Sequence, residues 1–145
     1  MIMEQINEKK QKYKDSIIQF LKFGIVGGIN TIVSYAITNI GFYVFDLHPQ
    51  ICNAAAFAIT VFISFILNSQ FVFTQSEDEK TPFLKALFKV YVSYSITGLF
   101  LMGILLYIEE SIFGIPHYIA TLANLIVTIP INFILNKFWA YKNKW

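Results

Sequence analysis

Residues 23–45 read FGIVGGINTIVSYAITNIGFYVF, a run of 23 residues without a charged side chain. Three more uncharged runs follow, at residues 47–76, 90–108 and 111–136, and they hold 30, 19 and 26 residues. A membrane-spanning helix needs about 20 apolar residues, so each run is long enough for one crossing. The sequence therefore predicts an all-α integral membrane protein, with four transmembrane helices at residues 20–45, 51–73, 87–108 and 118–138.

The composition agrees with a chain that faces lipid. Of its 145 residues, 56% are hydrophobic and only 14% are charged, whereas soluble domains carry about a quarter of charged residues. Its 15 Phe and 8 Tyr suit a lipid-facing surface with aromatic interfaces. The length leaves no room for a separate soluble catalytic domain. We expect a cytoplasmic N-terminal segment at residues 1–19 and one membrane domain at residues 20–142.

The lysines predict the orientation of the chain. All 11 basic residues are Lys, and they lie at the N-terminal end, in or beside the loop at residues 74–86, and near the C-terminus. The other two loops carry only Asp46, Glu109 and Glu110. Basic residues accumulate on the cytoplasmic side of membrane proteins, so both termini should be cytoplasmic. Residues 1–19 fit either a helix on the inner membrane surface or a solvated tail, and nucleic-acid binding is disfavoured.

The chain contains an internal repeat. Residues 65–68 and 133–136 both read FILN, at an offset of 68, and aromatic residues follow at matching positions. The offset is close to half of the chain, and each half contains two predicted crossings. We therefore expect two parallel-repeat helical hairpins, related by a pseudo-twofold axis along the membrane normal.

Polar residues recur at every fourth position of the second and fourth predicted helices. Residues four apart share one face of a helix, and lipid cannot satisfy an amide, so these faces should turn inward or line a wet cavity. The Thr and Ser positions favour hydrogen bonds between helices. The Asn positions fit such bonds or a path for a polar substrate. The two stripes are Thr60, Ser64, Asn68 and Asn124, Thr128, Asn132, Asn136.

Two further features of the helices affect packing. Gly24 and Gly28 form a GxxxG pair, which allows close approach of a helix either within the chain or in a dimer. Pro130 lies inside the fourth predicted helix and cannot donate to the carbonyl of Ile126, so we expect a kink or an opening there.

Lysines also lie at the predicted inner ends of three helices, at Lys22, Lys89 and Lys137. They either extend to the membrane surface on their own, as lysines near helix ends commonly do, or form a cationic cluster for a lipid phosphate. Lys85 lies one helical turn before Lys89 and would join such a cluster. The aromatic residues that could flank a headgroup are Tyr91, Phe71 and Trp139.

Several classes of function have no support in the sequence. There is no Ser/His/Asp set, no metal-ligand spacing around the single Cys52, and no glycine-rich nucleotide loop, so we expect neither catalysis nor a metal or other cofactor. His48 and His117 are read as loop residues. No charged residue lies deep in a predicted span, which argues against a proton-coupled exporter of small solutes.

The ordered set of these residues resembles the GtrA-like family. Residues 20–30, FLKFGIVGGIN, carry an aromatic and basic start, a glycine cluster and then Asn30. Asn68 and Asn136, each followed by an aromatic-rich helix end, are also similar to that family. The resemblance covers residues 18–142 and is closest to the GtcA-type branch, which acts in teichoic acid glycosylation in Gram-positive bacteria.

The resemblance implies translocation, or flipping, of an undecaprenyl-phosphate-linked monosaccharide across the bacterial cytoplasmic membrane. It implies glycosyltransferases on both membrane faces as partners, besides membrane lipids, and it gives weight to Asn30, Asn68, Lys89, Asn136 and Lys137. A homodimer also fits the small size. The alternatives are a non-transporting scaffold for a glycosyltransferase and a solute exporter. The predicted substrate-binding residues are Lys22, Asn30, Ser64, Asn68, Lys85, Lys89, Tyr91, Asn132, Asn136 and Lys137.

Overall fold

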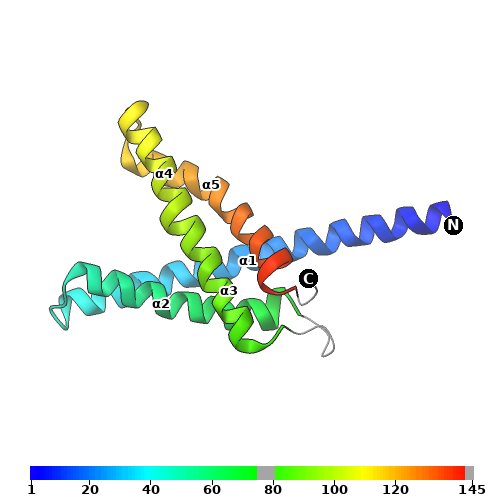
Figure 1. Cartoon of the computed structure of the whole chain (residues 1–145), viewed down its shortest axis with the longest axis horizontal. Coiled ribbons are helices and arrows are strands. Elements are labelled where there is room, and N and C mark those ends of the chain that lie inside the picture. Colours follow the sequence, from blue (N-terminus) through cyan, green and yellow to red (C-terminus); the bar gives the residue numbers. More distant parts are fainter. Residues whose placement is uncertain (75–80, 143–145) are drawn as a thin grey trace. The chain divides into compact units, whose positions relative to one another are not determined.

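The computed structural model describes residues 1–74 and 81–142, and within these residues the regular structure is entirely helical. The chain divides into two compact units, Met1–Thr74 and Gln75–Trp145. Each unit is a helical hairpin, coloured blue to green and green to red in Figure 1. The acidic residues of the loop between the two hairpins, Glu77, Asp78 and Glu79, lie outside the described residues.

The first unit consists of α1 (Ile2–Tyr43), α2 (Pro49–Leu67) and the π-helical segment η1 (Asn68–Val72). Both α2 and η1 pack against α1 (Figure 1). The absence of charge over residues 23–45 lets α1 run through an apolar environment, because a helix satisfies its own backbone hydrogen bonds. The same reason holds for α2 and η1, which together form a 24-residue helix, Pro49–Val72.

The turn between α1 and α2 has clear local causes. Asp46 adopts a positive φ of 52°, a conformation that Asp tolerates better than most residues. The His48 side chain then caps α2, because its Nδ1 accepts a hydrogen bond from the Gln50 backbone N–H at 3.3 Å. Pro49 occupies the first helical position, where no intrahelical N–H bond is needed.

The second unit begins with a 30-residue helix, Phe83–Ile112, which is α-helical at both α3 (Phe83–Ser95) and α4 (Met102–Tyr107). The π-helical segments η3 (Ile96–Leu101) and η4 (Ile108–Ile112) interrupt it. After a turn that includes Gly114 at φ 65°, α5 (His117–Leu135) and the π-helical segment η5 (Asn136–Ala140) return along it. Figure 1 shows α4 beside the start of α5.

In the part of the chain that the structure describes, four helices are thus long and apolar enough to cross a membrane, as many as the sequence predicted. The bounds agree within about four residues except at the start of the chain. There, α1 continues without a break from Ile2, where the sequence predicted a span beginning at residue 20. Residues 2–19 are therefore helical and continuous with the first candidate span, and their place at the inner membrane surface stays a prediction.

The second helices of the two hairpins have matching lengths. Both α2 and α5 contain 19 residues, and His117 lies 68 positions after Pro49, the offset of the FILN repeat. In both hairpins the α-helix changes to a π-helix at the asparagine of FILN, Asn68 or Asn136. The helix continues through Pro130, and the irregular segment begins six residues later.

Close packing in the first hairpin occurs at Gly41 and not at the GxxxG pair. A Cβ added at Gly41 would lie 2.8 Å from the Cys52 Sγ, whereas no atom lies within 4 Å of a Cβ at Gly24, Gly27 or Gly28 in the described part of the chain. Gly24 and Gly28 are therefore not the seam between α1 and α2, and their role as a seam with any other helix stays a prediction. Gly41 lets the end of α1 approach the start of α2.

We predict that Gly41→Ala lowers the stability of the protein by about 1–3 kcal/mol, because the new methyl group overlaps the Cys52 sulfur. The measurement is the midpoint of thermal unfolding in detergent. The control is Gly24→Ala, where the added methyl group meets open space. In a Cys52→Ala background the loss from Gly41→Ala should shrink, and an equal loss in both backgrounds would contradict this packing.

Candidate functional site

The polar stripes predicted from the sequence are almost entirely buried. Ser64, Asn68 and Asn136 are 0% exposed, and only Asn132 is half-buried. Beyond both ends of each stripe, small buried residues follow at the same four-residue spacing. This buried row runs from Cys52 to Val72 in the first hairpin and from Ala120 to Ala140 in the second. The expected inward-facing polar stripe is therefore present on the second helix of each hairpin.

The threonines of the stripes are satisfied by their own helices. Thr60 Oγ1 donates to the Ala56 carbonyl at 2.7 Å, and Thr128 Oγ1 donates to the Asn124 carbonyl at 2.9 Å. These hydroxyls therefore do not form the bonds between helices that the sequence favoured for them. For Thr60 and Thr128 that expectation is wrong, because each hydroxyl proton is used within its own helix.

In each hairpin, a hydrogen bond between two polar side chains joins the two helices. In the first hairpin, Asn30 Nδ2 of α1 donates to Ser64 Oγ of α2. In the second, Thr97 Oγ1 of η3 donates to Asn132 Oδ1 of α5 at 2.6 Å. Thr97 is not among the residues that we selected from the sequence, although its place four residues after Ser93 was a signal for it. Its Oγ1 also lies 2.9 Å from the Ser93 carbonyl oxygen, so its single hydroxyl proton is shared between the two acceptors.

A lysine lies against an aromatic ring near one end of each hairpin. Lys22 Nζ is 4.8 Å from the centroid of the Phe71 ring, and Lys89 Nζ is 5.7 Å from the Trp139 ring. Lys89 Nζ also donates to the Trp139 carbonyl at 3.0 Å. A cation on a ring face contributes about 0.5–2 kcal/mol, so these contacts fix both lysine side chains in place.

The two kinds of contact have the same spacing in both hairpins. Lys22 and Lys89 each precede the polar residue of their own helix, Asn30 or Thr97, by eight positions. On the return helices, the polar residue precedes the aromatic residue by seven positions. At 1.5 Å per residue, the lysine and the polar pair lie about 12 Å apart along each helix.

Several buried asparagine atoms have no hydrogen-bond partner among the residues that the structure describes. They are both amide atoms of Asn68, Oδ1 of Asn30 and Asn136, and Nδ2 of Asn124. Asn136 Nδ2 does donate to the Asn132 carbonyl at 2.8 Å. An unsatisfied buried polar atom costs about 1–3 kcal/mol, so these amides require water or a polar ligand.

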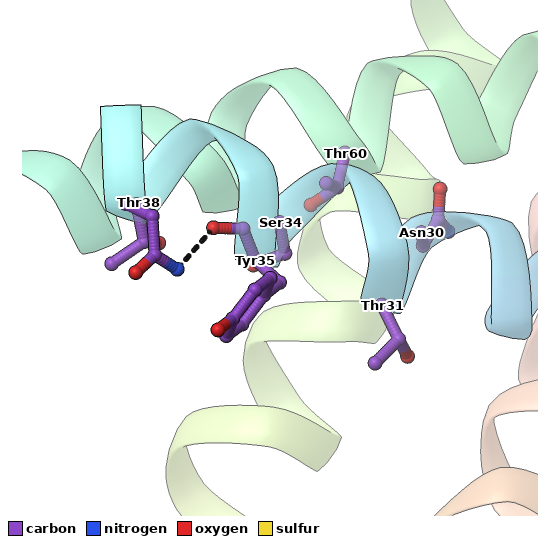
Figure 2. Close-up of a pocket in the computed structure, with 7 residues that line it drawn as sticks. Asn30, Thr31, Ser34, Tyr35, Thr38 and Thr60 are labelled. Atoms are coloured by element: carbon purple, nitrogen blue, oxygen red, sulfur yellow. Dashed lines mark hydrogen bonds between the residues drawn. The ribbon is translucent and has the colours of Figure 1, made fainter. Parts of the chain in front are cut away.

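The first hairpin also contains a pocket of about 590 Å³ beside α1. Thr60 of α2 lies at its edge, and the remaining lining comes from α1 (Figure 2). The Asn39 Nδ2 donates to the Tyr35 carbonyl at 2.7 Å, drawn as the dashed line. Of the residues of α1 that line this pocket, only Asn30 was predicted as a site residue from the sequence. The residues of α1 that line it are Asn30, Thr31, Ser34, Tyr35, Thr38 and Asn39.

A comparison with known protein families identifies the family of the chain. The family described as GtrA/DPMS, transmembrane domain, matches residues 22–141. The chain belongs to this family. No curated protein matches the chain. The family is associated with polysaccharide and cell-surface glycosylation and is generally not catalytic. The match begins at Lys22 and ends at Tyr141, so it contains both lysine–aromatic pairs and both polar pairs.

The predicted site residues of this GtrA/DPMS domain fall into one set in each hairpin. Lys85 is exposed on α3, one turn before Lys89, and Tyr91 is half-buried on the same helix. Lys137 Nζ lies 5.5 Å from the Phe133 ring and 5.7 Å from the Phe138 ring. The first set is Lys22, Asn30, Ser64 and Asn68, and the second is Lys85, Lys89, Tyr91, Asn132, Asn136 and Lys137.

The remaining titratable side chains of the domain include a histidine–glutamate pair. His117 Nδ1 lies 2.5 Å from Glu110 Oε1 at the turn before α5, where both side chains are accessible. Within residues 1–74 and 81–142 no three metal-ligating side chains gather. Burial raises the pKa of the Tyr141 hydroxyl, so this group stays neutral at the end of the second stripe.

The two polar pairs make a quantitative prediction. In a double-mutant cycle, Asn30→Ala and Ser64→Ala should show a coupling energy of about 0.6 kcal/mol, and at most about 1.7 kcal/mol, as found for hydrogen bonds between membrane helices. Thr97→Val and Asn132→Ala should give a similar value. Thermal or denaturant unfolding in detergent measures the four stabilities.

The control cycle pairs Asn30→Ala with Asn39→Ala, nine positions away on the same helix or about 14 Å. These two changes should be additive. A coupling energy as large as in the first cycle would show that the Asn30–Ser64 bond has no specific role.

Proposed function

We propose that this protein moves a polyprenyl-phosphate-linked monosaccharide across the bacterial cytoplasmic membrane, for the glycosylation of teichoic acid or another cell-wall polymer. The observation that carries the proposal is the fully buried Asn68, whose amide nitrogen and oxygen find no partner among the described residues. An amide can both donate to and accept from a sugar hydroxyl, so it can replace water around a headgroup that crosses lipid.

The lysines supply the second requirement, a place for the phosphate. Lys22 and Lys89 are each held by an aromatic ring at one end of their hairpin. A held cation near the membrane surface attracts an anionic lipid headgroup and does not enter the apolar interior. Lys85 and Lys137 add positive charge at the same end of the second hairpin, and Tyr91 would flank the headgroup. The acyl tail stays in lipid, so only the headgroup needs a polar route.

We also propose that the two hairpins are copies of one repeated unit with the same orientation. The support is the recurrence of four features at an offset of 67 or 68 residues. They are the FILN sequence, the π-helical segment, the polar pair and the lysine–aromatic pair. With all lysines toward one side, both termini would be cytoplasmic. A glycosyltransferase on the inner face would supply the lipid-linked sugar, and another on the outer face would use it.

A second candidate function, that of a scaffold without transport, has its own support in α1. The helix extends from Ile2, well before the matched domain begins at residue 22, and residues 2–15 are exposed. Such a helix offers a surface for a glycosyltransferase. The open space around Gly24 and Gly28 would suit a second copy of the chain. If the scaffold is the function, purified protein moves no lipid, and a glycosyltransferase co-purifies with it.

The transport proposal predicts that Asn68→Ala and Asn136→Ala each slow the movement of a labelled polyprenyl-phosphate sugar by about tenfold. Removing the amide takes away hydrogen bonds worth about 1.4 kcal/mol during the crossing. The measurement is transbilayer movement in liposomes that contain the purified protein. Gln70→Ala is the matched control, because Gln70 is an exposed amide in the same π-helical segment. Variants that insert normally and move lipid as fast as the unaltered protein would exclude a role for the stripe.

The phosphate role of the lysines is tested separately. Lys22→Gln and Lys89→Gln should each weaken binding of sugar-free polyprenyl phosphate about fivefold, since each charge near the surface contributes about 1 kcal/mol. Binding is measured in nanodiscs of uncharged lipid at low and high salt, and the effect should diminish at high salt. Lys9→Gln, on the exposed start of α1, should have little effect. An equal effect of all three variants would indicate non-specific attraction.

A further inference from the structure

The part of α1 that follows Asn30 carries two parallel rows of polar side chains. Asn30, Ser34 and Thr38 form one row at four-residue spacing, and Thr31, Tyr35 and Asn39 form the other. All six line the pocket of about 590 Å³ described above (Figure 2), and we call them the α1 polar track. A smaller pocket of about 270 Å³ continues it to the end of the hairpin, where Phe42, Tyr43 and Pro49 contribute to its lining.

The second hairpin provides an internal comparison for the α1 polar track. The two shared contacts place α1 and the first helix of the second hairpin at an offset of 67, since Lys22 matches Lys89 and Asn30 matches Thr97. At the same offset, four positions of the track match only apolar residues. These are Leu101, Met102, Leu105 and Leu106. A hairpin with the same two contacts therefore does not need polar residues there, and the track has a purpose other than folding.

Several side chains of the α1 polar track have hydrogen-bonding atoms that are not used within the described part of the chain. The side-chain oxygens of Ser34, Tyr35 and Thr38 bond to no residue in the described part of the chain. The Oδ1 of Asn30 is buried without a partner there. Thr31 Oγ1 donates to the Gly27 carbonyl at 3.0 Å, but its oxygen can still accept. In an apolar environment such groups favour a ligand that both donates and accepts.

The α1 polar track is also uncharged along its whole length. Neither pocket is lined by a charged residue, and the nearest charges on the chain are Lys22 and Asp46. Lys22 precedes Asn30 by about 12 Å along the helix. A charged ligand in such a place would lose its hydration without gaining a counter-charge, whereas a neutral polyol would not. The volume lies within the usual range for small-molecule pockets.

We propose that the α1 polar track is the binding site for the sugar part of the transported lipid, and that it selects a neutral sugar, a hexose or an N-acetylhexosamine, over an acidic one. This inference rests on the proposed function, because a lipid-linked sugar is assumed as the cargo. Tyr35 is the aromatic member of the track, and its ring is exposed. The ring offers an apolar face for the C–H side of the sugar and a hydroxyl for the polar rim of the sugar.

The test is equilibrium binding of three short-chain polyprenyl phosphates to the full chain in nanodiscs. The probes carry glucose, glucuronic acid or no sugar. We expect the glucosyl lipid to bind at least tenfold more tightly than the glucuronosyl lipid. In Ser34→Leu/Thr38→Leu, which introduces the residues that the second hairpin has at the matching positions, binding of the glucosyl lipid should weaken about tenfold. Binding of the sugar-free lipid should not change.

Two further variants keep this test decisive. Thr121→Leu is the matched control, since the Thr121 hydroxyl bonds only to the His117 carbonyl of its own helix, at 2.8 Å, and lies outside the track. It should bind all three lipids normally. If Ser34→Leu/Thr38→Leu does not fold, Ser34→Ala/Thr38→Val removes the same two hydroxyls with little change in volume, and the same selective loss is expected.

The outcomes separate this proposal from the transport function. Equal affinity of the unaltered protein for the glucosyl and glucuronosyl lipids overturns the selection of neutral sugars. An equal change for the glucosyl and sugar-free lipids in the double variant, or no change at all, overturns the sugar site. If the unaltered protein binds the glucosyl lipid selectively but moves no lipid in liposomes, the transport function fails while the sugar site stands.

Discussion

In each hairpin, a hydrogen bond between two polar side chains links the two helices and helps to set their register. Lipid tails are as apolar as the helix surfaces, so the hydrophobic effect does little to select one register of two membrane helices over another. A polar side chain changes this, because it has few partners and each failure to reach one costs about 1–3 kcal/mol. Asn30 with Ser64, and Thr97 with Asn132, are the pairs that distinguish the observed registers from those one turn away.

The position of the lysines follows from that register. A slip of one helical turn, about 5.4 Å, would separate the polar pair and would also move Lys22 from the Phe71 ring, or Lys89 from the Trp139 ring and carbonyl. The two contacts in a hairpin therefore stabilise each other's geometry over a distance of about 12 Å. Since the same spacing occurs twice, a single solution to helix registration has been used in both halves of the chain.

The sequence predicted those features that depend on composition and periodicity alone. Uncharged runs determined the four helices, and four-residue spacing determined which face of α2 and α5 is buried. It could not predict that Asn30 reaches Ser64, because pairing between residues 34 positions apart depends on helix rotation and register. It also missed the π-helical segments at Asn68 and Asn136, since an i→i+5 bond leaves no compositional signal. Glycine spacing did not locate the close contact between α1 and α2, because that contact is at Gly41, whose only signal is the neighbouring Cys52 in three dimensions.

Charge is distributed unevenly within the first hairpin and at the corresponding end of the second. Lysines held against aromatic rings lie at one end, whereas uncharged amides and hydroxyls line the pocket along α1. Under the proposed function, the lysines would attract the phosphate and the uncharged groups would face the sugar. A lysine moved into the middle would bind the phosphate more strongly there, and it would hold the cargo instead of releasing it. The α1 polar track belongs to the first hairpin, whereas the second hairpin has leucine and methionine at four of the matching positions. The lysine–aromatic pair and the polar pair occur in both hairpins, but the α1 polar track occurs in the first hairpin. We therefore expect each chain to carry one sugar headgroup at a time.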